Sequence, residues 1–191
     1  MAKTANPNQG PVSIQQSTRE PRPFVRIEPK GGAGVLPAEA KRGIAWLRSC
    51  AESRAAWLAN ALVDFTIARD LRRQRGRGRT EPIQVAVLNR RRRAARSWIE
   101  AILAGAIDAA TLRSLAHSWL PQLCGTGPEL DKSLVLGRGL FEFVRGALTA
   151  LVFEEPQENL LPEARAMHGL ETVLATHLQA AVAAAQGKKR D

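Results

Sequence analysis

The stretch from Pro128 to Phe153 constrains the fold of this chain more than any other. Its apolar residues recur at steps of three and four, which is the spacing of one face of an α-helix. They are Leu130, Leu134, Gly137, Phe141, Val144, Leu148 and Leu151, with a second stripe of Leu136, Leu140, Phe143, Ala147 and Ala150. A helix that is apolar over so much of its surface must be covered by several others. The stretch therefore predicts the central helix of an all-α bundle.

Four further segments carry the same periodicity, so we expect a bundle of about five helices. The expected helices and their buried residues are 38–73 (Ile44, Leu47, Ala51, Leu58, Leu62, Phe65), 82–105 (Leu88, Ala95, Trp98, Ile99, Ile102), 108–120 (Leu112, Leu115, Ala116, Trp119) and 160–187 (Leu160, Ala164, Met167, Leu174, Leu178, Ala181). The start signals are Thr80-Glu81-Pro82, Asp108 and Asn159, because short polar side chains cap helix N-termini. Gly187 is the predicted terminator of the last helix.

Residues 1–36 are expected to form a flexible tail that precedes a single helical domain at 37–187. The segment holds five of the eleven prolines together with four glycines, so it cannot keep a helical hydrogen-bond ladder and has little apolar area to bury. Within it, Arg22–Lys30 carries Phe24 and Ile27, which could dock on the bundle or add to the sheet edge of a partner.

Gly139 and Gly146 lie seven residues apart, on one face of the central helix. Each costs about 1 kcal/mol of helix propensity relative to alanine. Two interpretations remain open at this point: the close approach of a neighbouring helix, or simple sequence drift.

The net charge of +10 is concentrated in one short segment. Residues 1–68 carry a net charge of +4, residues 69–96 carry +9, and residues 97–191 carry −3. This Arg-rich helix–loop–helix junction at 69–96 is the clearest functional signal in the sequence. Its candidate polyanion-binding residues are Arg72, Arg73, Arg75, Arg77, Arg79, Arg90, Arg91, Arg92, Arg93 and Arg96.

The two groups of arginines differ physically. Arg72–Arg79 surround Gly76 and Gly78 in a segment that resembles the arginine–glycine segments tracking nucleic-acid backbones. Arg90–Arg93 are four consecutive residues in a predicted helix, and they sweep about 300° around its axis. No single solvated face can hold all four. Either this turn stands clear of the bundle, or the negative charge of a partner meets one side of it, and long arginine stems can also reach around the helix towards solvent.

The junction admits a functional and a structural interpretation. In the first, its arginines bind nucleic-acid phosphates or another polyanion. The binding would be weakly sequence-selective, since no aromatic residue lies between Phe65 and Trp98 to stack on bases. In the second, the basic stripe is solvated or pairs with the acidic turn at Glu154–Glu163.

The sequence predicts no catalytic, cofactor-binding or metal site. His168 and His177 are nine residues apart and so lie about 180° apart on one helix, where they cannot share a metal. Neither Cys50 nor Cys124 has a histidine near it in sequence, and two thiols make no disulfide framework. No apolar run is long enough for a membrane span. We expect a non-enzymatic, cytoplasmic protein without a membrane partner.

Three stretches between Arg90 and Ala185 follow an order of features found in a known family. They are Arg96-Ser-Trp98-Ile99, Leu136–Arg145 and the closing helix from Met167 to Leu178. In this order they resemble the helical amino-terminal sensor domain of bacterial stress-response co-antagonists of the RsbRD type. The resemblance covers about half of the chain, rests on pattern alone and transfers no functional residues. It implies a non-catalytic signal-input or dimerisation bundle, although such domains are usually joined to an output domain for which this chain has no room.

Three functional hypotheses follow. The first is a non-enzymatic helical interaction or regulatory module that works through protein contacts, with itself as a homodimer or with another protein. The second is a nucleic-acid-binding protein that contacts phosphates through residues 69–96. The third is a ligand-binding bundle or enzyme with a pocket among Trp98, Trp119 and Phe141.

Overall fold

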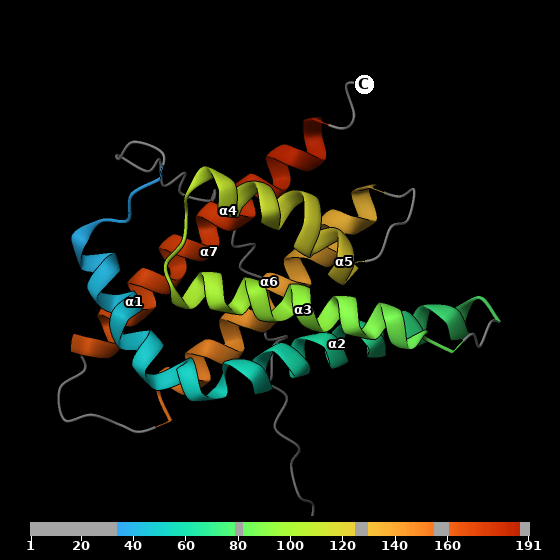
Figure 1. Cartoon of the computed structure of the whole chain (residues 1–191), viewed down its shortest axis with the longest axis horizontal. Helices are drawn as coiled ribbons and strands as arrows, with labels where there is room; N and C mark the ends of the chain where they lie inside the picture. The colour runs from blue at the N-terminus through green and yellow to red at the C-terminus, as the bar shows by residue number, and fades with distance from the viewer. Residues whose placement is uncertain (1–33, 79–81, 125–129, 155–160, 188–191) are drawn as a thin grey trace, which may run out of the picture. The chain divides into compact units, whose positions relative to one another are not determined.

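The computed structural model describes residues 34–78, 82–124, 130–154 and 161–187, with the backbone alone at 130–136 and 187. The chain divides into two compact units, Met1–Lys30 and Gly31–Asp191, and every described residue lies in the second. Within the described ranges there are helices and no strands, which confirms the predicted all-α bundle (Figure 1). The helical elements are α1 (Ala38–Ala51), the 3₁₀ turn η1 (Glu52–Arg54), α2 (Ala55–Gly76), α3 (Val85–Leu103), α4 (Ala109–Ser114), the π-helical turn η2 (Leu115–Trp119), α5 (Leu120–Cys124), α6 (Leu130–Val152) and α7 (Leu161–Gly187).

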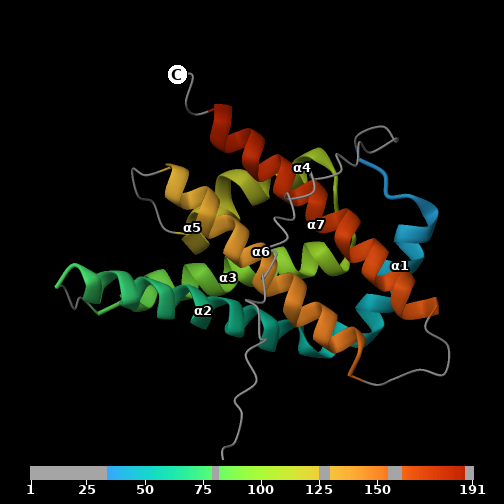
Figure 2. The ribbon, with the colours of Figure 1, turned by 180° about the vertical axis from the view of Figure 1, so that it is seen from behind.

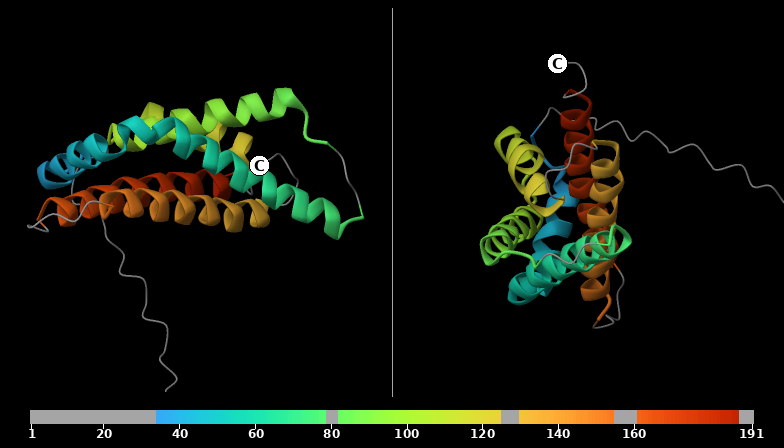
Figure 3. Two further views of the ribbon diagram at one scale, coloured as in Figure 1. Left: turned by 90° about the horizontal axis from the view of Figure 1, so that it is seen from below. Right: turned by 90° about the vertical axis from the view of Figure 1, so that its right-hand side faces the viewer.

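The helices of this unit pack in two layers. The helix α6 lies along α7 in one layer, and α2 and α3 lie over them in the other (Figures 2 and 3). The helix α1 packs along α7, while the run α4–η2–α5 contacts both α3 and α7. Each long helix therefore has an apolar face covered by neighbours from other parts of the sequence, as a bundle requires.

The helix predicted between Pro128 and Phe153 is confirmed as α6, but its predicted second stripe is only partly covered, since Ala150 is exposed and Phe143 and Ala147 are partly buried. Its buried residues among those whose side chains are described are Leu140, Phe141, Val144, Leu148 and Val152. At the centre of the core, the Trp98 ring meets the Phe141 ring edge to face, with 4.9 Å between centroids and 66° between planes. This geometry is the preferred one for aromatic pairs. The core thus joins α3 to α6.

The helix boundaries agree with the predictions at some ends and differ at others. Asp108 caps α4 as predicted, because its Oδ1 accepts hydrogen bonds from the backbone N–H groups of Ala110 and Thr111, each at 2.9 Å. The end of α3 near Gly105 is also confirmed: Gly105 has φ +65°, the left-handed conformation that terminates helices. The start of α3 is different, since the helix begins at Val85 and not at Pro82. The predicted cap at Thr80 and Glu81 lies outside the described residues.

Two predicted helices are interrupted. The segment predicted as one helix from Ala38 to Arg73 is divided by η1, where the axis turns between α1 and α2. The run after Asp108 contains the π-helical turn η2 between α4 and α5. An amphipathic pattern reports the side chains that face the core, but a local change of helix type leaves that pattern almost intact.

The close helix approach occurs at glycines other than the predicted pair. A Cβ atom on Gly146 would meet nothing within 4 Å, and one on Gly139 would lie 3.9 Å from Phe65 Cζ, an ordinary contact. The close approach instead joins α1 to α7. A Cβ on Gly43 would lie 1.8 Å from the Arg165 carbonyl oxygen, and a Cβ on Gly169 would lie 2.6 Å from the Ala40 carbonyl oxygen. Backbone therefore packs on backbone where α1 crosses α7.

The buried face of α7 is rotated from the predicted one. Ala164, predicted as buried, is exposed, and Met167, Leu178 and Ala181 are only partly buried. The buried residues of α7 are Glu163, Ala166, Gly169, Leu170, Val173, Leu174 and His177, of which the predicted face contained Leu174. The predicted Leu160 and the cap at Asn159 lie outside the described residues. Alanines occur on every side of this helix, so the periodicity alone leaves its orientation ambiguous by about one residue.

Among the described residues, no helix is long and apolar enough to cross a membrane.

Candidate polyanion-binding surface

The arginines of residues 69–96 are held on a pair of neighbouring helices that run in opposite directions. The C-terminal half of α2 and the N-terminal half of α3 extend past the ends of α5 and α6 (Figure 1). We call this pair of half-helices, Arg69–Gly78 and Val85–Arg96, the basic hairpin. The two helices diverge towards their free ends (Figure 3). Because neighbouring helices cover so little of this region, its side chains are largely open to solvent.

Most of the predicted site residues are exposed on the basic hairpin. Arg79 lies outside the described residues. Arg96 is exposed and pairs with Glu100 on the same helix, with 2.8 Å between Nε and Oε1. The remaining exposed arginines have no ion-pair partner within the described ranges: they are Arg72, Arg73, Arg75, Arg77, Arg90, Arg92 and Arg93. The hairpin thus presents seven positive charges that have no ion-pair partner among the described residues.

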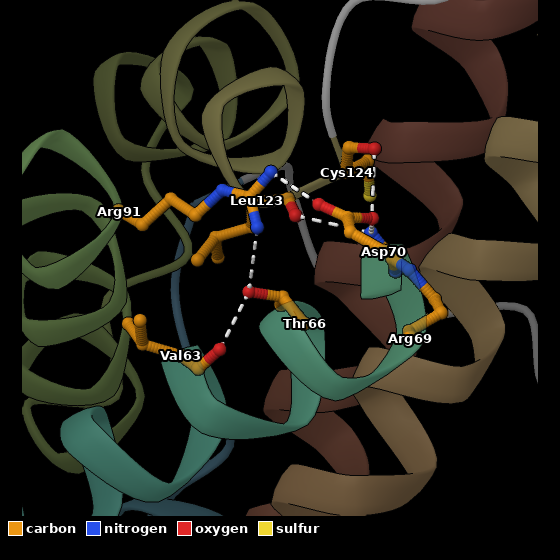
Figure 4. Close-up of polar contacts among 7 residues, drawn as sticks. All are labelled: Val63, Thr66, Arg69, Asp70, Arg91, Leu123 and Cys124. Carbon is orange, nitrogen blue, oxygen red and sulfur yellow. Dashed lines mark hydrogen bonds and ion pairs between the residues drawn. The ribbon is translucent and has the colours of Figure 1, made fainter. Parts of the chain in front are cut away.

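Arg91 lies apart from this exposed set. Its side chain points into the contact between α3 and α2, where its Nη2 lies 2.5 Å from Asp70 Oδ2 (Figure 4). Its Nη1 donates to Thr66 Oγ1 at 3.3 Å, and Thr66 in turn donates to the Val63 carbonyl oxygen at 2.7 Å. Only 6% of Arg91 is exposed. Arg91 therefore holds the two helices together, and a bound polyanion would not reach its guanidinium.

The placement of Arg91 explains how one helix carries four consecutive arginines. The sweep of about 300° around the axis necessarily aims one of them at the core. A buried guanidinium needs a counter-charge and hydrogen-bond acceptors, and Asp70 and Thr66 provide both. Arg90, Arg92 and Arg93 are then distributed over the solvent-facing side of α3.

Arg69, which the sequence did not single out, joins the basic hairpin to α5. Its Nη2 lies 3.4 Å from Asp70 Oδ1, and donates to the carbonyl oxygens of Leu123 and Cys124 at 3.3 Å each. These carbonyls end α5, where a helix leaves its acceptors unpaired and carries partial negative charge. Burial raises the pKa of the Cys124 thiol beside it, against the opposing effect of the Arg69 charge. The only local sequence feature that could have predicted this structural role of Arg69 is the acidic residue next to it, Asp70.

Asp70 therefore serves two cations at once. Arg69 Nε and Nη1 and Arg91 Nε are buried and have no hydrogen-bond partner in the described structure. These atoms have almost no accessible surface, so they do not form a binding site. The cluster has an excess of positive charge, which makes Asp70 the group on which its electrostatics depend.

The described residues of the acidic turn at Glu154–Glu163 form no ion pair with the exposed arginines of the basic hairpin. Glu154 pairs with Arg54 on η1. Glu163 is buried and its carboxylate has no hydrogen-bond partner in the described structure. Glu155 and Glu158 lie outside the described residues. Among described side chains, then, the exposed arginines of the basic hairpin are not neutralised by this turn.

The aromatic residues considered for an internal pocket belong to the core. Trp98 and Phe141 are buried against each other, and Trp119 is partly buried against the same core. The Trp98 indole N–H donates to His177 Nδ1 at 3.2 Å, and His177 Nε2 lies 2.7 Å from the Ala106 carbonyl oxygen. Both nitrogens of the imidazole are thus satisfied in its neutral form. His177 is therefore a structural residue of the core.

Two open hollows mark the surface near α1 and α3. One, of about 500 Å³, is lined by two ion pairs among other residues: Arg48 on α1 with Glu52 on η1, and Arg96 with Glu100 on α3. The other, of about 380 Å³, lies beside Gly34–Leu36. Within the described ranges no three His, Cys, Asp or Glu side chains come close enough to hold a metal ion.

Comparisons with protein-family models, with curated proteins and with solved structures find no match to this chain. The resemblance of residues 90–185 to the stress-response sensor domains therefore stays a prediction.

Proposed function

We propose that this protein is a non-enzymatic helical module that binds nucleic acid through the phosphates, using the exposed arginines of the basic hairpin. One observation carries the proposal: seven arginines without ion-pair partners in the described structure gather where α2 and α3 extend beyond the bundle. Such a concentration of positive charge raises the free energy of the isolated protein through self-repulsion. A polyanion removes that repulsion.

Arginine suits this task because its planar guanidinium donates two parallel hydrogen bonds to a phosphate and keeps its charge at any physiological pH. Between Phe65 and Trp98 there is no aromatic side chain to stack on a base. The hairpin therefore offers the contacts that position a protein on a backbone and lacks those that read base identity through stacking. We expect affinity that depends strongly on salt and weakly on sequence.

The test is a binding titration with short duplex DNA and duplex RNA between about 50 and 300 mM salt. The informative variant replaces Arg72, Arg75, Arg90 and Arg93 by glutamine and leaves Arg91 in place, because Arg91 is structural. We expect the wild type to lose affinity steeply as salt rises. In the variant the log–log slope should flatten by about 0.9 for each removed arginine that contacts a phosphate.

A second quadruple variant controls for the change in net charge. It replaces four exposed arginines outside the hairpin by glutamine, namely Arg42, Arg48, Arg113 and Arg145. If both variants bind alike, the hairpin is not the binding surface. If the wild type shows no salt-dependent binding at 50 mM salt, the proposal is refuted.

Exposed apolar side chains favour protein contacts as a second candidate function. Trp57 is 62% exposed on α2, and Phe153 is 51% exposed at the end of α6. Large apolar residues at the surface are enriched where proteins meet. Sedimentation of the wild type and of Trp57→Ser over a hundredfold range of concentration tests self-association. A monomer throughout would contradict the homodimer.

A further inference from the structure

The contact between Asp70 and Arg91 identifies the sides of α2 and α3 that face each other. Around an α-helix each residue advances by about 100°, so the directions of the other arginines follow from these two residues. Arg72 lies about 160° from Asp70, and Arg75 about 140° from it on the opposite flank. Both are exposed and point away from α3.

The same reasoning applies to α3. Arg93 lies about 160° from Arg91, so it points away from α2, and Arg90 lies about 60° from Arg93, on the flank beside it. Both are exposed and have no ion-pair partner within the described ranges. The outward arginines of α2 and those of α3 therefore occupy opposite sides of the basic hairpin.

The two sides are too far apart for one straight duplex to contact both of them. Packed helix axes lie about 8–10 Å apart and each helix with its side chains is about 10–12 Å wide, so the outer sides of the hairpin are at least about 20 Å apart. The divergence of α2 from α3 towards their free ends widens this separation (Figure 3). A major groove about 12 Å wide admits one helix, so both helices cannot enter it side by side.

We infer that the basic hairpin binds two segments of nucleic-acid duplex at once, one against the outer side of α2 through Arg72 and Arg75, the other against the outer side of α3 through Arg90 and Arg93. This inference rests on the proposed function. The positive charge on each side complements a phosphate backbone, and Arg72, Arg75, Arg90 and Arg93 are all exposed to solvent. The product of binding is a bridge between two duplexes.

The test measures energy transfer between two pools of a 20-base-pair duplex, one carrying a donor dye and one an acceptor dye, at about 50 mM salt. Wild-type protein below the concentration of duplex should raise the transfer efficiency. A large excess of protein should abolish the transfer, because each hairpin then holds at most one duplex. The loss at excess protein separates a bridge from simple aggregation.

Two double variants assign the bridge to the two sides. Arg72→Gln with Arg75→Gln removes the α2 side, and Arg90→Gln with Arg93→Gln removes the α3 side. Each should still bind a single duplex with salt dependence and should give no energy transfer. The matched control, Arg42→Gln with Arg113→Gln, removes two charges elsewhere and should keep the transfer.

Several results would overturn the inference without touching the proposed function. Salt-dependent binding of the wild type with no energy transfer means that only one duplex is held. Transfer that persists in either double variant places the bridge elsewhere, for example in a protein dimer with one duplex on each copy. The absence of any salt-dependent binding, in contrast, refutes the proposed function and this inference together.

Discussion

Asp70 determines which arginines of the basic hairpin are structural. Its two carboxylate oxygens contact Arg91 at 2.5 Å and Arg69 at 3.4 Å. One acidic side chain thus compensates two largely buried cations, one from the neighbouring helix and one from its own. The same contact fixes the directions of the exposed arginines, because it sets how α2 faces α3.

Removing the Asp70 carboxylate should therefore destabilise the fold more than removing the Arg91 guanidinium. Asp70→Asn leaves two buried guanidinium groups without their carboxylate, and we expect it to cost about 3 kcal/mol of unfolding free energy. Arg91→Met leaves Asp70 paired with Arg69 and should cost less. Urea unfolding of both variants measures the order.

A pairwise comparison checks the cause. The double variant Asp70→Asn with Arg91→Met removes one cation together with the carboxylate, so it should be more stable than Asp70→Asn alone. If the double variant is the less stable of the two, then the cost of Asp70→Asn does not come from unpaired charge.

His177 should make stability fall on the acid side of neutrality. Burial lowers the pKa of His177 below its usual range, and this outweighs the opposing effects of the hydrogen bond with Ala106 and of the Asp108 charge. The unfolded chain then binds a proton below about pH 6.5 that the folded chain resists. The stability that His177 contributes is complete above that pH. It is lost as the pH falls towards the lower, folded-state pKa, at up to about 1.4 kcal/mol per pH unit.

The variant His177→Gln tests this sign. Glutamine can still accept from Trp98 and donate to Ala106, but it does not titrate. Unfolding free energies at pH 7.5 and pH 5.0 should differ less in the variant than in the wild type. Equal pH dependence in the two proteins would show that other groups are responsible.

At the scale of single elements, the crossing of α1 and α7 admits no side chain at its glycines. A Cβ on Gly43 would overlap the Arg165 carbonyl group, which belongs to the backbone and cannot turn aside. Gly43→Ala should therefore cost about 3 kcal/mol, near the upper end of the usual range for overpacked cores. Thermal and urea unfolding measure the loss.

Gly146 on α6 provides the control, because an added Cβ there would have no neighbouring atom within 4 Å. Gly146 is exposed and helical, so Gly146→Ala should stabilise the protein by up to about 1 kcal/mol. Opposite signs at Gly43 and Gly146 would separate helix packing from helix propensity. Destabilisation of similar size at both positions would contradict the assigned crossing.

The elements themselves could largely be predicted from the sequence, since five amphipathic segments are visible and their apolar stripes are long. Their orientations could be predicted less well. The last helix is apolar on several sides, so the buried position of His177 depends on partners that the local pattern does not contain. No local pattern predicts the role of Gly43 either, because it depends on contact with a helix more than a hundred residues away.

The candidate site was predictable to a similar degree. The local density of arginine predicted where the basic surface lies. The spacing of Arg90–Arg93 around one helix predicted that not all four could face solvent, but not which one is buried. The answer, the pairing of Arg91 with Asp70, depends on how α2 lies against α3 across a separation of 21 residues. The sequence alone contains no measure of that register.

At the scale of the whole molecule, the charge is separated from the core. The region 69–96 carries a net charge of +9, whereas residues 97–191 carry −3. If duplex DNA neutralises the hairpin, it stabilises the folded state through mass action. At a free concentration of 100 times Kd the gain is about 2.7 kcal/mol.

Duplex DNA at about 50 mM salt should therefore raise the Tm of the wild type, and raising the salt to about 300 mM should remove most of that increase. The variant with glutamine at positions 72, 75, 90 and 93 should show little increase under the same conditions. Scanning calorimetry measures both. An equal increase in both proteins would place the binding outside the hairpin.

The crossing of Gly43 and Gly169 also has a consequence for the order in which the fold is assembled. The ribosome makes α1 early and α7 more than a hundred residues later. At synthesis rates of 5–20 residues per second, α1 waits roughly ten seconds for the helix that covers it. During that interval its apolar face, with Ile44 and Leu47, has no α7 to pack against. Until α7 has been made, this apolar face is therefore open to chaperones and to incorrect packing against other segments.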